Sequence, residues 1–104
     1  MKNVENTNDC KRVLVSKLTY ELPVLRARLG ISQAELATTI GISRQTYNSI
    51  ETGKRDMPWT TFMALIAVFQ NNDETRKMIN SIDGLEDAIG LYEHKTQGIS
   101  NSTI

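Results

Sequence analysis

Apolar residues recur along the chain at intervals of three and four positions, in five stretches that glycine, asparagine or proline residues separate. Such intervals place side chains on one face of an α-helix, which turns once in about 3.6 residues. The five stretches run from near Thr19 to Leu29, from Ser32 to Ile40, from Ser43 to about Thr52, from Pro58 to Phe69 and from Asp73 to about Gly84. They predict an all-α fold, a bundle of five short helices, and residues 85–92 leave room for a sixth short helix.

The two ends of the chain lack this pattern. Residues 1–11 are polar, and Val13 and Val15 alternate weakly with polar neighbours, as in a short extended segment. The sequence therefore predicts a flexible N-terminal arm over residues 1–17 and a helical domain over residues 18–70. A C-terminal helical extension over residues 71–93 and a flexible tail over residues 94–104 are expected to follow.

The most informative stretch, from Ser32 to Thr52, predicts two short helices joined by a tight turn. Ser32 and Glu35 have the spacing of a capping box, in which each side chain accepts a hydrogen bond from the backbone N–H of the other residue. Gly41 ends the first helix, because only glycine enters the left-handed conformation at little cost. Ser43 caps the second helix. Two helices and a glycine-containing turn in this order indicate a helix-turn-helix.

The second helix of this motif has two different faces. At about 100° per residue, one arc carries only hydrogen-bonding side chains, namely Arg44, Gln45, Asn48 and Ser49. Thr46, Tyr47 and Ile50 lie on the opposite side. Arginine and glutamine can pair bidentately with guanine and adenine edges in the major groove of DNA. An ordinary amphipathic surface helix shows the same division, so the two faces alone leave both interpretations open.

The segment SQAELATTIGISRQTYNSIETGKR, residues 32–55, resembles the helix-turn-helix of the lambda-repressor and Cro-type family, also called the xenobiotic-response-element type. The matching positions are Gln33, Ala37, Gly41, Ile42, Ser43, Ile50, Glu51, Gly53 and Lys54. The resemblance extends over roughly Leu18 to Phe69, about half of the chain. It implies a lambda-repressor-like fold and sequence-specific binding of duplex DNA, most simply by a transcriptional repressor.

The resemblance also implies roles for individual residues. It makes Arg44, Gln45 and Ser49 the readers of base edges, and Gln33 a phosphate ligand at a helix N-terminus. It makes Thr46, Asn48, Lys54 and Arg55 phosphate or secondary contacts. It further implies a structural ion pair between Arg26 and Glu51. Related repressors often carry glutamine at the position of Ser49, whose shorter side chain has less reach.

Charge is balanced in total but distributed unevenly. Twelve lysines and arginines face twelve aspartates and glutamates, which argues against a protein that coats nucleic acid without sequence preference. Residues 16–70 carry six basic and four acidic side chains, and residues 71–104 carry three basic and six acidic ones. The expected DNA-binding part is thus mildly positive, so we expect it to neutralise few phosphates.

Motifs of catalysis, cofactor binding and membrane insertion are not found. The sequence has no HExxH, phosphate-binding glycine loop, CxxC pair or serine elbow, so we identify no catalytic residue, metal ligand or cofactor. Cys10 and His94 are each the only residue of their type. No apolar run approaches the roughly 20 residues of a membrane-spanning helix, and no signal peptide is recognised. We therefore expect a cytoplasmic protein that is not an enzyme.

Two further partners are predicted besides duplex DNA. One such domain contacts few base pairs, so a homodimer on a palindromic site is expected, with residues 71–93 as the candidate dimer segment because their apolar positions exceed what a five-helix core needs. The alternative function is an antitoxin-like DNA binder that holds a partner protein through the same residues. A protein-interaction adaptor without a DNA role is disfavoured by Arg44 and Gln45.

Overall fold

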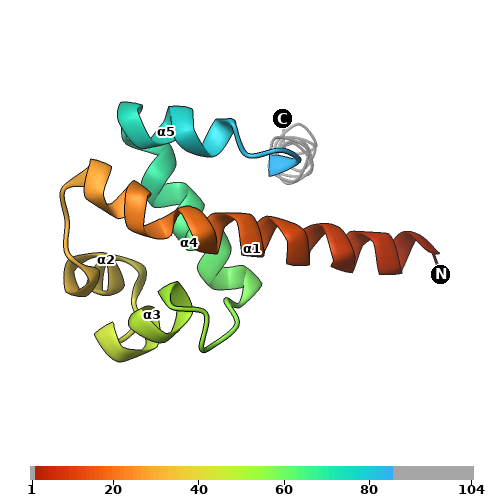
Figure 1. Cartoon of the computed structure of the whole chain (residues 1–104), viewed down its shortest axis with the longest axis horizontal. Coiled ribbons are helices and arrows are strands. Elements are labelled where there is room, and N and C mark those ends of the chain that lie inside the picture. Colours follow the sequence, from red (N-terminus) through yellow and green to blue (C-terminus); the bar gives the residue numbers. More distant parts are fainter. Residues whose placement is uncertain (1, 86–104) are drawn as a thin grey trace, which may run out of the picture.

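The computed structural model of the protein describes the backbone of residues 2–85 and the side chains of residues 9–85. Five helices follow one another: α1 (Lys2–Leu29), α2 (Gln33–Ile40), α3 (Arg44–Glu51), α4 (Trp59–Gln70) and α5 (Asp73–Asn80), as Figure 1 shows. The described residues contain no strand. The predicted all-α bundle with a helix-turn-helix is therefore confirmed. Apart from Leu85, the predicted sixth helix lies outside the described residues.

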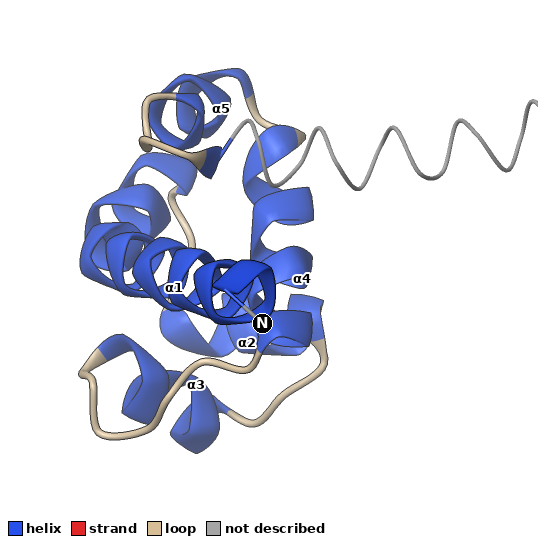
Figure 2. Ribbon diagram, turned by 90° about the vertical axis from the view of Figure 1, so that its right-hand side faces the viewer, coloured by secondary structure: helices blue, strands red, loops and turns tan. Residues whose placement is uncertain are grey.

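The long helix α1 lies at the centre of the bundle. It packs against α3, α4 and α5. In Figure 2, which looks along it, α5 is above α1, α3 is below it and α4 is at its side. Leu14, Leu18, Leu22 and Leu25, spaced by three and four residues, are all buried on the side that faces these helices. The core of the molecule is thus built around a row of leucines on one helix.

The length of α1 corrects two expectations. The first helix does not begin near Thr19, because the backbone is helical from Lys2 and the predicted flexible arm over residues 1–17 is continuous with the rest of α1. Thr19 does not cap a helix; its hydroxyl donates to the Val15 carbonyl at 2.7 Å within α1. The helix extends toward the N-terminus because Leu14 and Leu18 bury their side chains in the core.

Pro23 lies inside α1, whereas in a helix that begins near Thr19 it would have been in the first turn. Since proline has no N–H, it leaves the carbonyl four residues earlier without its usual helical donor. Pro58 also differs from expectation, because it is the N-cap residue of α4 rather than its first helical residue.

The helix α5 is attached to α4 by a buried threonine. Thr75 is fully buried, and its hydroxyl donates to the Phe69 carbonyl at 2.7 Å. Asn72 caps α5, but the helix ends at Asn80 with Ser81 as its C-cap and not at Gly84, which lies in the turn that follows. Ile79 is fully buried among core residues from the other helices.

The apolar residues of the segment from residue 71 to residue 85 are used inside the protomer. Ile79 and Leu85 are fully buried, and Met78 and Ile82 pack against the same core. The apolar surplus that suggested a dimer segment over residues 71–93 is therefore absent from this part, and residues 86–93 lie outside the described residues.

The aromatic residues of α4 belong to the core: Phe62 and Phe69 are buried, and Trp59 packs against the buried residues. Trp59 and Phe62 stack with ring centroids 4.4 Å apart, and the Lys11 ammonium of α1 lies 5.0 Å from the Trp59 ring. None of the helices among the described residues is both long and apolar enough to cross a membrane.

A leucine substitution in the first half of α1 tests its place in the core. Leu14→Ala removes a side chain that is 4% exposed, so it should lower the free energy of unfolding by about 2–5 kcal/mol, the usual cost of a buried leucine. Its neighbour Val13, which is 51% exposed, provides the control, and Val13→Ala should change stability by less than about 1 kcal/mol. Urea denaturation followed by circular dichroism measures both. Equal effects of the two substitutions would show that this part of α1 does not belong to the core.

Candidate DNA-binding site

The first helix of the motif begins at a complete capping box. The Ser32 hydroxyl accepts from the Glu35 N–H at 3.1 Å, and a Glu35 carboxylate oxygen accepts from the Ser32 N–H at 2.9 Å. Hydrogen bonding to the Glu35 carboxyl, from the Ser32 backbone N–H first and from the Ser32 side chain second, lowers the pKa of this carboxyl. The box also fixes where α2 starts. The other N–H groups in the first turn of α2 have no partner within the helix, so they remain available as hydrogen-bond donors.

The turn between the two helices has the geometry that the sequence predicts. Gly41 has a φ of 82°, in the left-handed region, and its N–H donates to carbonyls at the end of α2. The Ile42 N–H returns to the Ala37 carbonyl at 3.0 Å, and the Ile42 side chain packs against the core. Ser43 then caps α3 by accepting from the Thr46 N–H at 3.0 Å. This turn sets the angle at which α3 leaves α2.

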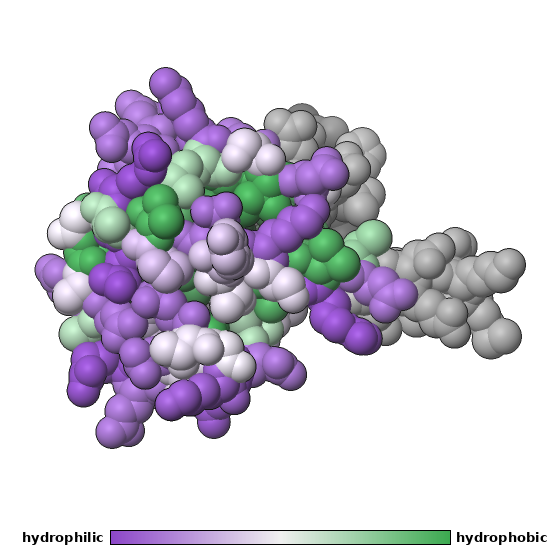
Figure 3. Space-filling view, viewed as in Figure 1, coloured by the Kyte–Doolittle hydropathy of each residue, from purple (hydrophilic) through white to green (hydrophobic). Residues whose placement is uncertain are grey.

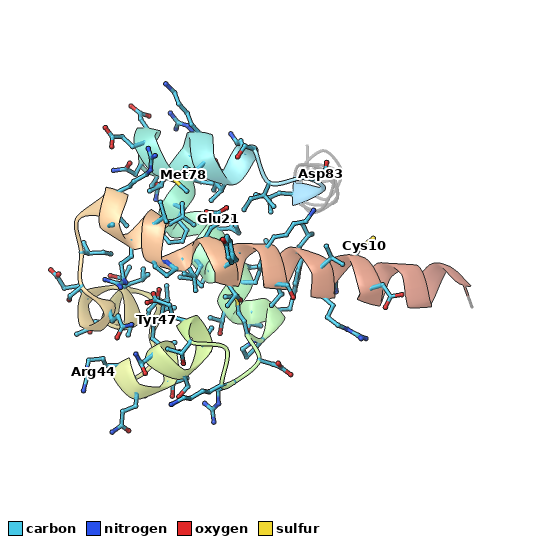
Figure 4. All side chains as sticks on the ribbon, in the orientation of Figure 1. Cys10, Glu21, Arg44, Tyr47, Met78 and Asp83 are labelled. Atoms are coloured by element: carbon cyan, nitrogen blue, oxygen red, sulfur yellow. The ribbon has the colours of Figure 1, made fainter. Side chains whose placement is uncertain are left out.

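The helix α3 separates its side chains into a buried and an open face. Tyr47 and Ile50 are buried in the core, whereas Arg44 and Gln45 at the start of the helix are exposed. In Figure 4, Arg44 points away from the molecule and Tyr47 points toward α1. Asn48 and Ser49 are half-buried, and so is Thr46, whose hydroxyl faces the cap. The predicted division of faces is thus present at this helix.

The end of α3 is held by a single carboxylate, that of Glu51. The Arg26 guanidinium donates to both of its oxygens, each at 3.2 Å. The Tyr47 hydroxyl donates at 2.5 Å and the Gln33 amide at 2.9 Å. The donors come from α1, α2 and α3, so Glu51 joins the two helices of the motif to the central helix. The predicted pair between Arg26 and Glu51 is present.

These bonds keep Glu51 ionised although its side chain is only 7% exposed. Burial alone would raise the pKa of the Glu51 carboxyl, but hydrogen bonds from Arg26, Tyr47 and Gln33 outweigh burial and lower it. In the same network, the bond to Glu51 raises the pKa of Arg26, and burial, followed by the bond to Glu51, raises that of Tyr47. The network therefore has a stable charge state at neutral pH.

Gln33, the predicted phosphate ligand, is part of this network. One of its amide N–H groups donates to Glu51, and its amide oxygen accepts from the Asn48 side chain at 3.1 Å. A glutamine amide carries two N–H donors, so one remains for an outside ligand. The two bonds hold the amide at the junction of α2 and α3. Gln33 is thus a link between the two helices, and the structure orients the side chain before any ligand binds.

The loop after α3 brings two basic residues back beside the helix. The N–H groups of Lys54 and Arg55 donate to the Ser49 carbonyl at 2.9 and 3.0 Å. Arg55 also reaches the Thr46 hydroxyl, at 3.5 Å, and both basic side chains are exposed. The sequence-predicted residues of α2, α3 and this loop therefore lie on adjoining elements.

The open part of this surface is positive. Arg44, Lys54 and Arg55 are exposed, while the charge of Glu51 is buried and paired with Arg26. Glu35 is exposed but holds the cap of α2, and Asp56 is the exposed acid of the loop. A helix with hydrogen-bonding side chains and flanking cations is suited to a polyanion such as the DNA backbone.

No metal site is built here. Within residues 9–85, no group of three or more histidine, cysteine, aspartate or glutamate side chains is close enough to hold a metal ion. Cys10 is exposed on α1, far along the chain from the motif.

Tyr47 is a site residue that the sequence placed only on the side of the helix opposite the hydrogen-bonding arc. Its ring is fully buried, yet its hydroxyl makes the shortest bond to Glu51. The spacing of four residues between Tyr47 and Glu51 places the two side chains on one side of a helix, and this spacing was the available signal.

Residues 25–70 match the family model described as Helix-turn-helix. No curated protein and no solved structure matches the chain.

Loss of the Glu51 carboxylate should destabilise the whole domain. Glu51→Ala leaves the buried Tyr47 hydroxyl without its acceptor and the Arg26 guanidinium with only the Ile31 carbonyl, at 3.3 Å. Removing one partner of a buried pair costs roughly 3–5 kcal/mol, and we expect the lower end because Arg26 retains 22% exposure. The matched control is Asp73→Ala, which breaks the exposed pair with Arg76 and should cost less than about 1 kcal/mol. Thermal and urea denaturation measure both. A small effect of Glu51→Ala would show that the network does not hold α3.

Proposed function

The chain belongs, through residues 25–70, to the Cro/C1-type helix-turn-helix family of DNA-binding transcriptional regulators, and we propose that it is a sequence-specific repressor that binds duplex DNA as a homodimer. The observation that carries this proposal is the fixed orientation of α3. Its far end is held by the Glu51 network, while Arg44 and Gln45 at its start are exposed.

Base reading is assigned to the start of α3. In helix-turn-helix proteins the N-terminal residues of the second helix contact base edges in the major groove. Arg44 can donate two hydrogen bonds to guanine O6 and N7, and Gln45 can pair with adenine N6 and N7. Ser49 lies one turn further along, where its short hydroxyl reaches a base only at close approach.

Backbone contacts are assigned to the residues around this helix. Lys54 and Arg55 are exposed cations beside α3, and Gln33 has a spare amide N–H at the N-terminus of α2. A helix N-terminus favours phosphate through its unpaired N–H groups and its dipole. Thr46 and Asn48 are half-buried at the same surface and act through Arg55 and Gln33, which they contact.

Dimerisation and repression follow from the size of the site. One recognition helix contacts few base pairs, and each mismatched pair costs only about 1–3 kcal/mol, so one domain discriminates weakly. Two copies on a two-fold symmetric site read twice as many pairs. Occupancy of such a site is enough to exclude other proteins from it, so repression needs no chemistry beyond binding.

The other two functions have less support. An antitoxin-like protein would hold its partner through residues 71–93, but over residues 71–85 the buried apolar side chains belong to the protomer's own core. A protein-interaction adaptor would have no need for exposed Arg44 and Gln45 at the start of a rigidly held helix.

Selection of bound duplexes from a random DNA pool tests the function. We expect a palindromic consensus with half-site centres about one helical turn, roughly 34 Å, apart. Footprinting on the selected site should show protection of both half-sites on one face of the duplex. Recovery of sequences without any consensus would contradict specific binding, and a single asymmetric half-site would contradict the dimer.

Replacing Arg44 and replacing Lys54 should weaken DNA binding in different ways. Arg44→Ala should cost about 1–3 kcal/mol on the best site and relax the preference at one base pair of each half-site. Lys54→Ala should weaken good and poor sites alike and reduce the slope of log K against log salt by about 1. Lys77→Ala, an exposed cation on α5, is the control and should change neither quantity.

The measurement is binding to a panel of single-base operator changes at several salt concentrations. An even loss of affinity across the panel for Arg44→Ala would make Arg44 a backbone contact and not a reader.

A further inference from the structure

The helix α1 exposes a line of apolar side chains on the side away from the core. Val13 is 51% exposed, Tyr20 83% and Val24 46%, and these are the large hydrophobic residues exposed within the described side chains. Seven and then four residues separate them, so at about 100° per residue they fall within about 40° of one another around the helix. We call these three residues the α1 stripe.

The described part of the chain leaves the α1 stripe open. The leucines of α1 face α3, α4 and α5, while the stripe lies on the other side of the same helix. Figure 2 shows α5, α4 and α3 around three sides of α1 and no helix on the fourth. In Figure 3, green apolar atoms alternate with pale and purple ones on the face that shows α1.

We propose that the α1 stripe is the homodimer surface, on which α1 of a second copy packs in the antiparallel direction. This inference rests on the proposed function, because it names the interface of the proposed DNA-bound dimer. It moves the interface from the C-terminal segment to the first helix.

The spacing of the stripe suits a pair of helices. Val13, Lys17, Tyr20, Val24 and Ala27 alternate intervals of four and three residues, which is the spacing of the contact positions in a two-helix coiled coil. If the midpoint of the pair lies between Lys17 and Tyr20, Val13 of one copy faces Val24 of the other. The stripe is thus complementary to a reversed copy of itself, as a two-fold interface requires.

Charge selects the antiparallel direction. In a parallel pair, Lys17 would face Lys17 of the second copy, and these like charges would repel each other. In the antiparallel pair, Lys17 faces Tyr20 of the second copy. Glu21 of the second copy follows this Tyr20 by one residue and lies on the same side of the contact as Lys17. Among the ion pairs of the described residues, neither Lys17 nor Glu21 takes part. The Lys17 ammonium donates only to the exposed Asp83 carbonyl, at 3.2 Å.

The position of α3 selects the same direction independently. In Figures 1 and 2, α5 and α3 lie on opposite sides of α1. Lys17 bonds to the Asp83 carbonyl after α5, and Tyr20 borders the loop that follows α3, so the stripe lies between the two. The two-fold axis of an antiparallel pair is perpendicular to both helices, so it leaves α3 of both copies on the same side. The axis of a parallel pair runs along the helices and would put the two α3 helices on opposite sides. Only the antiparallel pair offers both recognition helices to one duplex.

Three large apolar side chains per copy make a small interface. Interfaces that bury less than about 1,200 Å² belong to weak complexes. We therefore expect the fraction of dimer in free solution to rise with protein concentration. On a palindromic duplex the two bound copies are close together, so we expect the dimer to form fully there.

A charge-exchange experiment tests the proposal. Lys17→Glu places glutamates opposite Glu21 of the second copy, and Glu21→Lys places lysines opposite Lys17. Each variant alone should dimerise at least tenfold more weakly than the original chain. An equimolar mixture of the two variants should restore the dimer, because every Glu then faces a Lys of the other chain. Intrachain effects cannot produce this rescue, since neither chain changes on mixing.

Sedimentation equilibrium without DNA measures dimerisation, and binding to a single half-site duplex is measured separately. Tyr20→Glu should abolish dimerisation in every mixture, while Lys77→Glu on α5 should leave it unchanged. Thermal denaturation checks that each variant is folded. A Tyr20→Glu chain that dimerises normally would overturn the proposal, and a mixture without rescue would overturn the antiparallel contact.

The two proposals fail separately. If the original chain dimerises through α1 but binds neither half-site nor palindrome, the proposed function is wrong and the interface stands. If all variants dimerise equally and bind DNA, the interface is wrong and the function stands.

Discussion

The structure depends on one buried carboxylate with donors from three helices. A buried charge is costly unless it is paired and hydrogen-bonded, and Glu51 receives bonds from Arg26 of α1, Gln33 of α2 and Tyr47 of α3. These donors satisfy Glu51 only when the three helices have one relative arrangement. The orientation of α3 is therefore set at its C-terminal end. Arg44 and Gln45, at the other end, take no part in this network.

This arrangement joins stability to recognition. Gln33 donates to Glu51 and accepts from Asn48, so the residue at the start of α2 and the middle of α3 share one hydrogen-bonded chain. Ordering these side chains costs conformational entropy. Because folding has already ordered Gln33, the DNA contact that we propose for this residue would not carry that cost. In our proposal, the network thus prepares the phosphate contact of Gln33 as well as the angle of α3.

The helix α1 serves two purposes with opposite sides. Its leucines form the row around which the core is built, and its α1 stripe is the face for a second copy in our proposal. A continuous helix transmits the position of one side to the other, because backbone hydrogen bonds hold every residue in register. The two recognition helices of a dimer formed on α1 would therefore have a defined separation.

The sequence by itself determined the local features: the capping box of Ser32, the left-handed Gly41, the ends of α2 and α3, and the pair of Arg26 with Glu51 known by resemblance. These depend on residues a few positions apart or on a shared motif. It did not determine the start of α1. Val13 and Val15 suggest an extended segment, whereas Leu14 and Leu18 have the spacing of a helix. Only the burial of the two leucines against α4 and α5 decides between the two periodicities. The tertiary structure also decided that Gln33 and Tyr47 meet at Glu51 and that Ile79 and Leu85 belong to the protomer's own core. The physical reason is that a side chain's partners come from elements distant in sequence, whose positions are set by packing.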